Sequence, residues 1–223
     1  MNGPFAWFKW EALFADWPVF VDGFGHTALI SVLALGLSLI LGVLFGALAT
    51  SEWKPARAIS RVYVEFIQNT PLVIQIFFLY NGLPYLGLTM DVMAVGVIGI
   101  GIYHGAYIAE VFRAGINAVP RGQREAAASQ GFGYWKAMRH IILPQAQKVI
   151  MPPLTNQAIF LIKNTSVLAM VAGGELMYRA DSWSSNNLYY GPAYIVTGLL
   201  YLALCLPLSR LAKRLEANKQ AVA

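Results

Sequence analysis

Polar side chains inside apolar runs are the groups of this sequence that are best placed to contact a polar solute. Gln75 lies in the run from Val62 to Leu83, and Lys163 and Asn164 lie in the run from Val149 to Val171. Such groups are costly to hold in hydrocarbon, so they usually face a cavity or a partner. We therefore expect them to line a pathway or to bond across helices.

The helical rise places these groups within about two turns of the membrane midplane. Pro71 lacks a backbone N–H, so we expect Asn69 and Thr70 to line a kink there. The whole predicted pathway comprises Asn69, Thr70, Gln75, Tyr103, His104, Lys163, Asn164 and Thr165. His104 has an alternative interpretation as a packed histidine at a helix interface.

Catalytic and metal chemistry have no support in the sequence. HExxH and G-x-S-x-G motifs are absent, and His26, His104 and His140 fall at different membrane depths. The single cysteine, Cys205, excludes an intrachain disulfide and a redox pair. We predict no enzyme, no catalytic residue, no metal site and no cofactor in this chain.

Composition predicts an all-α protein that crosses a membrane several times. Hydrophobic residues make up 57% of the 223 residues, and charged residues make up only 12%. A helix needs about 20 apolar residues to span a bilayer. Five segments fit: His26 to Thr50, Val62 to Leu83, Val92 to Phe112, Val149 to Val171, and Leu188 to Leu208.

Basic residues predict the orientation. An outside amino terminus leaves Lys9 and Arg179 outside and Lys163 within the membrane. The other basic residues then face the cytoplasm: Lys54, Arg57, Arg61, Arg113, Arg121, Arg124, Lys136, Arg139, Lys148, Arg210, Lys213, Arg214 and Lys219. This asymmetry predicts a cytoplasmic carboxyl terminus. Because the charges lie at membrane edges, nucleic-acid binding is not expected.

The amino-terminal segment, residues 1–24, carries Trp7, Trp10, Phe14 and Trp17 on one helical face. We expect an interfacial helix on the outer surface, with a loosely ordered aromatic tail as the alternative. No cleavable signal peptide is visible. A transmembrane domain at 25–215 and a cytoplasmic tail at 216–223 complete the predicted organisation.

The longest cytoplasmic loop, at about 115–148, is charged and capable of forming helices. Gln123 to Gln130 is rich in good helix formers, and Tyr134 to Ile142 is a second short helical candidate. Gly131 and Gly133 interrupt the loop, and Pro144 is expected to end it. The pattern predicts two short helices joined at a glycine turn.

This loop resembles the signature of ATP-binding-cassette (ABC) importer permeases. Glu125-Ala126-Ala127, three residues, Gly131, nine residues, Ile141, one residue and Leu143-Pro144 match its spacing. Three stretches resemble the branch that carries polar amino acids such as histidine, glutamine, glutamate, arginine and opines: Arg61 to Phe78, which contains Gln68 to Leu72, Ala106 to Gly115, and Lys163 to Ser166. The resemblance covers about His26 to Leu215.

The resemblance implies a type I permease fold with five transmembrane helices in a bacterial inner membrane, alternating between open states. The loop would then form coupling helices that dock on a cytoplasmic ATPase through Arg121, Arg124, Glu125, Ala126, Ala127, Gly131, Trp135, Ile141, Leu143 and Pro144. Small residues allow close approach, and Trp135 and Ile141 would anchor in apolar pockets. An ordinary solvated loop is the alternative.

The resemblance also implies partners. No G-x-x-x-x-G-K-[ST] motif is present, so ATP and Mg would be bound by a separate ATPase subunit. A second permease, identical or similar, and an extracytoplasmic amino-acid-binding protein complete the expected assembly.

The implied substrate is a polar amino acid. Lys163, Asn164, Thr165 and Gln75 could supply donors for a carboxylate and acceptors for an amine. Many relatives have Asp where this chain has Asn164, so the local charge stays at +1 and glutamine or glutamate is favoured over arginine. An ion-coupled carrier or a channel subunit is the alternative, although carboxylates near the midplane are missing.

Other charged residues have simpler interpretations. Glu110 and Arg113 are expected to pair at the inner boundary of their helix, and Glu65 could pair with Arg113 or Arg61. Lys163 itself could instead be structural, paired with a carbonyl, Glu65 or Glu110. The outer segment from Gly173 to Gly191 could dock a binding protein or be only a polar loop.

Overall fold

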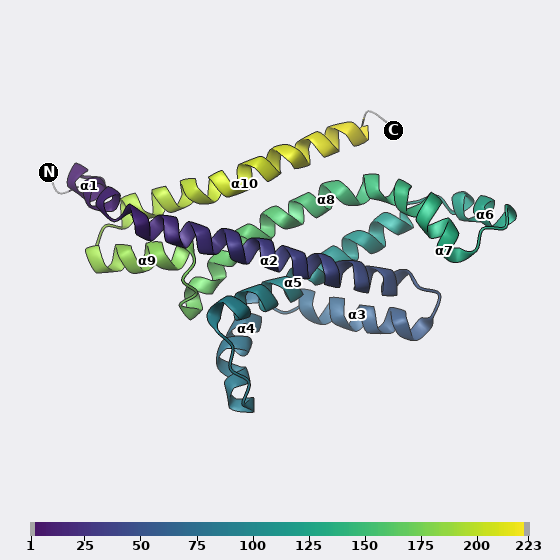
Figure 1. The fold of residues 1–223 in the computed structure, drawn as a ribbon, viewed down its shortest axis with the longest axis horizontal. Helices are drawn as coiled ribbons and strands as arrows, with labels where there is room; N and C mark the ends of the chain where they lie inside the picture. Colours follow the sequence, from purple (N-terminus) through teal and green to yellow (C-terminus); the bar gives the residue numbers. More distant parts are fainter. Residues whose placement is uncertain (1–2, 221–223) are drawn as a thin grey trace. The chain divides into compact units, whose positions relative to one another are not determined.

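A computed structural model describes residues 3–220 as a helical protein, and no strand occurs in that range (Figure 1). The helices are α1 (Trp7–Ala15), α2 (Trp17–Thr50), α3 (Lys54–Gln68), α4 (Leu72–Phe77), α5 (Val92–Asn117), α6 (Arg121–Ser129), α7 (Tyr134–Ala137), α8 (Leu143–Asn164), α9 (Leu176–Asn187) and α10 (Tyr190–Gln220). Short π or 3₁₀ segments are η1 (Phe78–Gly82), η2 (Leu83–Leu86), η3 (Met138–Ile142) and η4 (Thr165–Val171). The predicted all-α class is confirmed.

Within the described part of the chain, three helices are long and apolar enough to cross a membrane: α2, α5 and the part of α10 from Tyr190 to Leu215. Two bent pairs raise the number to five if each pair is one span. One pair joins Lys54–Gln68 to Leu72–Leu86 at 97°, and the other joins Tyr134–Val171 to Leu176–Asn187 at 46°. The span predicted from Val62 to Leu83 is therefore wrong as a continuous helix.

The break between α3 and α4 has a local cause. A residue before proline avoids the helical region, so Thr70 before Pro71 interrupts the helix. Asn69 ends α3, and its side-chain Nδ2 donates to the Glu65 carbonyl at 2.7 Å. The predicted interruption at Pro71 is confirmed, because α3 ends at Gln68 and α4 begins at Leu72.

Three predicted boundaries fall inside helices or outside the described residues. Helix α2 begins at Trp17 rather than His26, because Phe20 is fully buried against Trp183 in a core that this first part of α2 helps to form. The boundary at 215 lies within α10. Residues 1–2 and 221–223 of the predicted terminal segments lie outside the described residues.

The aromatic face predicted for the amino terminus is largely exposed. Trp7, Phe14 and Trp17 are exposed, and Trp10 packs partly against the neighbouring core. Leu13, which borders the aromatic face of α1 beside Trp10, is fully buried. A location in the membrane interface remains a prediction.

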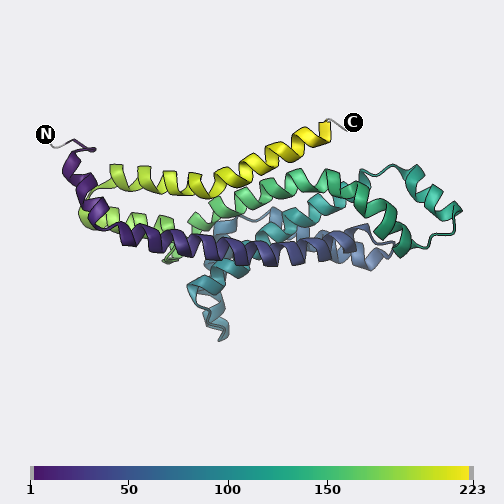
Figure 2. The same cartoon turned by 45° about the horizontal axis from the view of Figure 1, so that its top comes forward.

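The first of two compact units contains the described residues of Met1–Leu37, Thr70–Gly101 and Ile159–Pro207. Its core holds Leu13, Phe20, Leu176, Ala180, Trp183, Ala193 and Val196. Helix α9 lies in this unit beside the first part of α10 (Figures 1 and 2). The segment from Gly173 to Gly191, which was predicted to be a loop, is thus mostly helix, and that prediction is wrong.

A buried carboxylate explains why α9 forms. Glu175 is fully buried, and it accepts hydrogen bonds from the backbone N–H of Met177 at 2.7 Å and of Tyr178 at 2.8 Å. The Tyr201 hydroxyl donates to the same carboxylate at 2.9 Å. Glu175 therefore caps α9 and joins it to α10.

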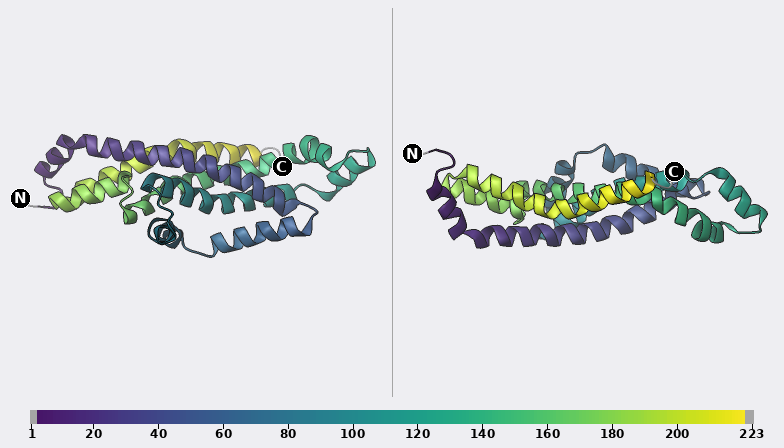
Figure 3. Two further views of the ribbon diagram at one scale, coloured as in Figure 1. Left: turned by 60° about the horizontal axis from the view of Figure 1, so that its bottom comes forward. Right: turned by 90° about the horizontal axis from the view of Figure 1, so that it is seen from above.

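The second unit contains Ser38–Asn69, Ile102–Ala158 and the described part of Leu208–Ala223. In it, α3 lies alongside the end of α2, and the Ser60 hydroxyl donates to the Phe45 carbonyl at 2.8 Å. The Tyr63 hydroxyl donates to the Ile102 carbonyl at 2.7 Å, which joins α3 to α5. Helices α6 and α7 lie beyond the ends of α5 and α8 (Figure 3).

Candidate functional site

The turn between α6 and α7 is a Schellman motif. Gly131 has φ 75°, the left-handed conformation that glycine adopts without penalty. Its N–H donates to the Ala128 carbonyl at 3.0 Å, and the N–H of Phe132 donates to the Ala127 carbonyl at 3.0 Å. The predicted glycine turn is confirmed, and the structure shows that Gly131 has a positive φ there.

Helix α6 is tied to the rest of the second unit by two side chains. The Arg124 guanidinium donates to the Ile116 carbonyl at 3.1 Å, at the end of α5. The Gln145 Nε2 donates to the side-chain oxygen Oε1 of Gln123 at 3.3 Å, which joins α8 to α6. Arg124, predicted as a contact to a partner, thus also has a role inside the chain.

Ala127 is a correction to the predicted coupling surface. Its side chain is 1% exposed, so it packs α6 against the chain and is not available to a partner. The neighbouring core is formed by Ile116, Val119, Ile142, Ala146 and Ile150, with Ile141 packed partly against it. Ala127 is small because the close packing of α6 requires it.

The other predicted coupling residues remain accessible on the chain. Trp135 is 81% exposed, which is unusual for so large an apolar side chain. Its ring lies 5.4 Å from that of Tyr134. The exposed members of the set are Arg121, Arg124, Glu125, Ala126, Gly131, Trp135, Leu143 and Pro144. An exposed aromatic pair beside charged residues is typical of a protein-binding surface.

Pro144 does not end the loop as predicted. The helix runs without a break from Tyr134 through η3 into α8. In η3 the Leu143 N–H donates to the Met138 carbonyl, five residues back. This wider π turn accommodates Pro144, which has no N–H to donate.

Gln75 and Thr70, both predicted pathway residues, contact each other across the start of α4. The Gln75 amide donates to the Thr70 hydroxyl at 2.7 Å and to its carbonyl at 3.3 Å. These bonds satisfy polar groups that the break at Pro71 leaves exposed. Helix α4 also packs against η4, the segment that follows Asn164.

Tyr103 and His104 lie in the second unit. His104 is 2% exposed, and its Nδ1 lies 3.1 Å from the Gln157 side-chain oxygen, which joins α5 to α8. The Tyr103 and Tyr107 hydroxyls lie 3.2 Å apart. This is the geometry of a packed interface histidine, the alternative interpretation of His104.

Lys163 is exposed, and its Nζ lies 5.6 Å from the centre of the Phe160 ring. Within residues 3–220 it forms no ion pair, so the predicted structural pairing with a glutamate is not observed there. Thr165, in contrast, is fully buried and donates to the Ile162 carbonyl at 2.7 Å. Thr165 therefore supports the backbone near Lys163 instead of facing a solute.

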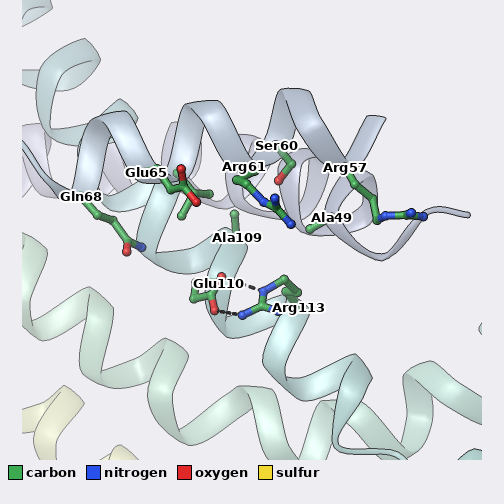
Figure 4. Close-up of a pocket in the computed structure, with 10 residues that line it drawn as sticks. Ala49, Arg57, Ser60, Arg61, Glu65, Gln68, Ala109, Glu110 and Arg113 are labelled. Atoms are coloured by element: carbon green, nitrogen blue, oxygen red, sulfur yellow. Dashed lines mark hydrogen bonds and ion pairs between the residues drawn. The ribbon is translucent and has the colours of Figure 1, made fainter. Parts of the chain in front are cut away.

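The structure also contains a polar cavity that the sequence reasoning missed. The cavity has a volume of about 550 Å³ and lies in the second unit, against α3 and α5 (Figure 4). Its charged lining includes Arg57, Arg61, Glu65, Glu110 and Arg113. The expected pair of Glu110 and Arg113 is confirmed, with the Arg113 Nε 2.9 Å from a carboxylate oxygen. The recurrence of polar residues on one face of α3 was the available signal.

Comparison with known proteins identifies the family. A family model described as "Binding-protein-dependent transport system inner membrane component" matches residues 38–220. This chain belongs to that family. The permease is therefore a membrane subunit of a transport system, as the loop signature predicted.

Relatives of the permease span nearly its whole length. It is 48% identical over 210 residues to the probable glutamine ABC transporter permease protein GlnM of Bacillus subtilis, covering 92% of the permease and 97% of GlnM. It is 34% identical over 211 residues to the glutamine transport system permease protein GlnP of Escherichia coli strain K12, covering 94% and 96%.

Solved structures agree with the type I permease fold. The permease matches a chain from "Crystal structure of an amino acid ABC transporter with histidines" with a TM-score of 0.86 and 33% identity, covering 93% of the permease and 97% of that chain. A chain of the inward-facing MetNI methionine ABC transporter matches with a TM-score of 0.71 at 15% identity, which supports the fold alone.

Proposed function

We propose that this permease carries glutamine or a similar polar amino acid into the cell by alternating access. The observation that carries the proposal is the 48% identity to a probable glutamine permease across 92% of the chain. The uncharged Asn164 beside Lys163 supports a zwitterionic or acidic substrate over a cationic one. Gln75, Thr70 and Asn69 contribute polar groups at the break between α3 and α4.

ATP and Mg bind to a separate ATPase subunit in this proposal, which docks on α6 and α7. The exposed Trp135 and the hydrogen-bonded Gly131 turn support this role, because a coupling element has to present an anchor in a defined geometry. Arg124 and Gln123 then transmit force from the ATPase to α5 and α8. The chain itself is non-catalytic.

The proposed assembly sits in a bacterial inner membrane with an outside amino terminus and a cytoplasmic carboxyl terminus. A second permease, identical or similar, completes the pathway, and an extracytoplasmic binding protein delivers the amino acid. The family description supports the binding protein in general terms. The excess of basic residues in the connections supports the orientation.

Uptake in vesicles tests the proposal. Vesicles containing the assembled complex and its binding protein should accumulate radiolabelled glutamine when ATP is supplied on the ATPase side. The same vesicles should show no uptake when a proton or sodium gradient replaces ATP. Gradient-driven uptake without ATP would establish the ion-coupled carrier and reject the importer.

A further inference from the structure

The cavity beside α3 separates this helix into two faces of opposite character. Arg57, Arg61, Glu65 and Gln68 recur every three or four residues, so they share the face that lines the cavity. The other face carries Ile59, Val62 and Phe66, which are 55%, 68% and 65% exposed. An exposed apolar face suits lipid or a partner helix, whereas charges in a membrane protein require a polar cavity.

Most of the charged groups at this cavity already have partners. Arg57 donates to the carbonyls of Ser51 and Glu52 at 2.8 and 2.9 Å, which ties it to the turn between α2 and α3. Glu110 and Arg113 form an ion pair with each other on α5. These contacts leave two charges at the cavity, one positive and one negative, to account for.

The two remaining charges are Arg61 and Glu65. Both side chains are exposed and line the cavity, and among the described side chains they form no hydrogen bond or ion pair. Side chains four residues apart on a helix are neighbours, with Cβ atoms about 5–6 Å apart. Figure 4 shows Arg61 directed from α3 toward the Glu110–Arg113 pair on α5. The cavity wall thus carries a guanidinium and a carboxylate from the same face of α3 that do not pair with each other.

We propose that this cavity binds the zwitterionic backbone of an α-amino acid, with Arg61 on the α-carboxylate and Glu65 on the α-ammonium. The proposal rests on the proposed amino-acid function and adds a binding site to it. A guanidinium binds a carboxylate in a bidentate manner, and an ammonium donates up to three hydrogen bonds. A simple anion or cation would satisfy only one of the two charges.

The size of the cavity and the position of Gln68 fit such a ligand. A volume of about 550 Å³ lies within the range of small-molecule pockets. Gln68 lies one turn beyond Glu65 on the same face. Its Nε2 donates to the Ala106 carbonyl at 3.4 Å, and the second N–H of this amide can meet a polar ligand side chain. The site uses none of the pathway residues predicted from the sequence.

Binding measurements with three probes test this assignment. The assembled permease–ATPase complex in nanodiscs would be titrated with L-glutamine, with glutaramate, which lacks the α-ammonium, and with 4-aminobutanamide, which lacks the α-carboxylate. The background variant Lys163→Met removes the charge of the other candidate site. We expect glutamine to bind about tenfold more tightly than either analogue, since each lost charged contact weakens binding by about that factor.

Two variants should separate the two contacts. Arg61→Gln should weaken glutamine binding about tenfold and leave the affinity for 4-aminobutanamide unchanged or higher, since that probe has no carboxylate. Glu65→Gln should also weaken glutamine binding about tenfold. It should leave the affinity for glutaramate unchanged or higher, since that probe has no ammonium group. Arg210→Gln and Glu52→Gln change the same kinds of exposed charge outside the cavity lining and should alter neither affinity.

A charge exchange tests whether a weaker affinity in a single variant comes from misfolding or from the lost charge. Arg61→Glu combined with Glu65→Arg keeps both charges at the cavity and should recover glutamine affinity to within about threefold of the parent. Co-elution of the ATPase on size exclusion checks assembly of each variant. Arg61→Lys keeps the charge but loses the bidentate geometry, so its glutamine affinity should lie between those of the parent and Arg61→Gln.

Three results would overturn the inference. Glutamine affinity that is unchanged in both single variants excludes the cavity as the site. If glutamine affinity falls in Arg61→Gln but not in Glu65→Gln, and glutaramate binds as tightly as glutamine, the cavity is a general anion site, such as one for a lipid headgroup. If the parent complex imports glutamine with ATP but shows no glutamine binding that depends on Arg61 and Glu65, this site is rejected and the proposed function stands. If the complex takes up no polar amino acid, the proposed function is rejected.

Discussion

The guanidinium of Arg124 donates to the carbonyl of Ile116 at 3.1 Å, and this bond joins the proposed coupling helix α6 to the end of α5. Helix α6 has nine residues, too few to be stable alone in water. Its position therefore depends on such tertiary bonds and on the burial of Ala127. Movement of α6 would in this way be transmitted directly to a helix that crosses the membrane.

Loss of the Arg124 bond should loosen α6. Arg124→Ala should speed amide hydrogen exchange in residues 121–130 by about fivefold, which corresponds to about 1 kcal/mol for one hydrogen bond. Hydrogen exchange with mass spectrometry would measure the change. Arg121→Ala is the matched control, because Arg121 is also exposed on α6 and makes no side-chain hydrogen bond within residues 3–220. Equal exchange in the two variants would contradict the role assigned to Arg124.

Substitution of Gly131 should uncouple transport without preventing membrane insertion. A Cβ at φ 75° costs about 1–2 kcal/mol for a residue other than glycine, and no neighbouring atom of the chain lies within 4 Å of it. Gly131→Asp should therefore reach the membrane at normal levels but lose the co-purifying ATPase and ATP-driven uptake. Gly131→Asn should lose less coupling, because Asn and Asp both tolerate the left-handed region but Asn adds no negative charge.

Gly122 provides the control for Gly131. It lies in the same segment without a positive φ, and a Cβ there also meets no atom within 4 Å. Gly122→Asp adds the same carboxylate and should retain more coupling than Gly131→Asp. Wild-type uptake by Gly131→Asp would remove the turn from the coupling mechanism.

Orientation can be tested with cysteines in a Cys205→Ala background. Gln130 and Ser185 are both exposed, so each should react when replaced by cysteine. An impermeant maleimide added to intact cells should label Ser185→Cys, and labelling of Gln130→Cys should require opened membranes. Labelling of both sites from outside would contradict the proposed orientation.

The charge of Lys163 should matter for substrates that carry a carboxylate. Lys163→Met keeps a long side chain and can retain a contact with Phe160, but it removes the cation. We expect ATP-driven uptake of glutamate and glutamine to fall about tenfold, because one charged contact is lost. Assembly with the ATPase should be retained. Unchanged uptake of glutamate, glutamine and arginine would refute a role in recognition, and failed assembly would support a structural role.

Glu175 should stabilise the first unit through its cap of α9. Glu175→Ala leaves two backbone N–H groups and the Tyr201 hydroxyl without their acceptor, so the free energy of unfolding should fall by about 2 kcal/mol. Thermal unfolding in detergent, followed by intrinsic fluorescence, would show the loss. Glu11→Ala, at an exposed position of α1, should have little effect, and an equal loss in both variants would argue against the capping role.

Local pattern was enough to predict the helical class, up to five spans, the kink at Pro71 and the turn at Gly131. Each depends on residues close together in the chain: a long apolar run, a proline that lacks an N–H, or a glycine after a short helix. The spacing from Glu125 to Pro144 was likewise visible in the sequence, and it indicated the family that the family model then matched.

Tertiary structure decided the features that depend on contacts between distant residues. The burial of Ala127, the pairing of His104 with Gln157 and the bond from Tyr201 to Glu175 each join segments that no local period connects. The charged face of α3 was visible in the sequence, but only the packing of α3 with α5 turns it into a cavity with Arg61 and Glu65 at its wall. The neighbours of a side chain in three dimensions decide whether it lines a cavity. From the sequence alone, Arg61 and Glu65 could not be distinguished from charged residues at a membrane boundary.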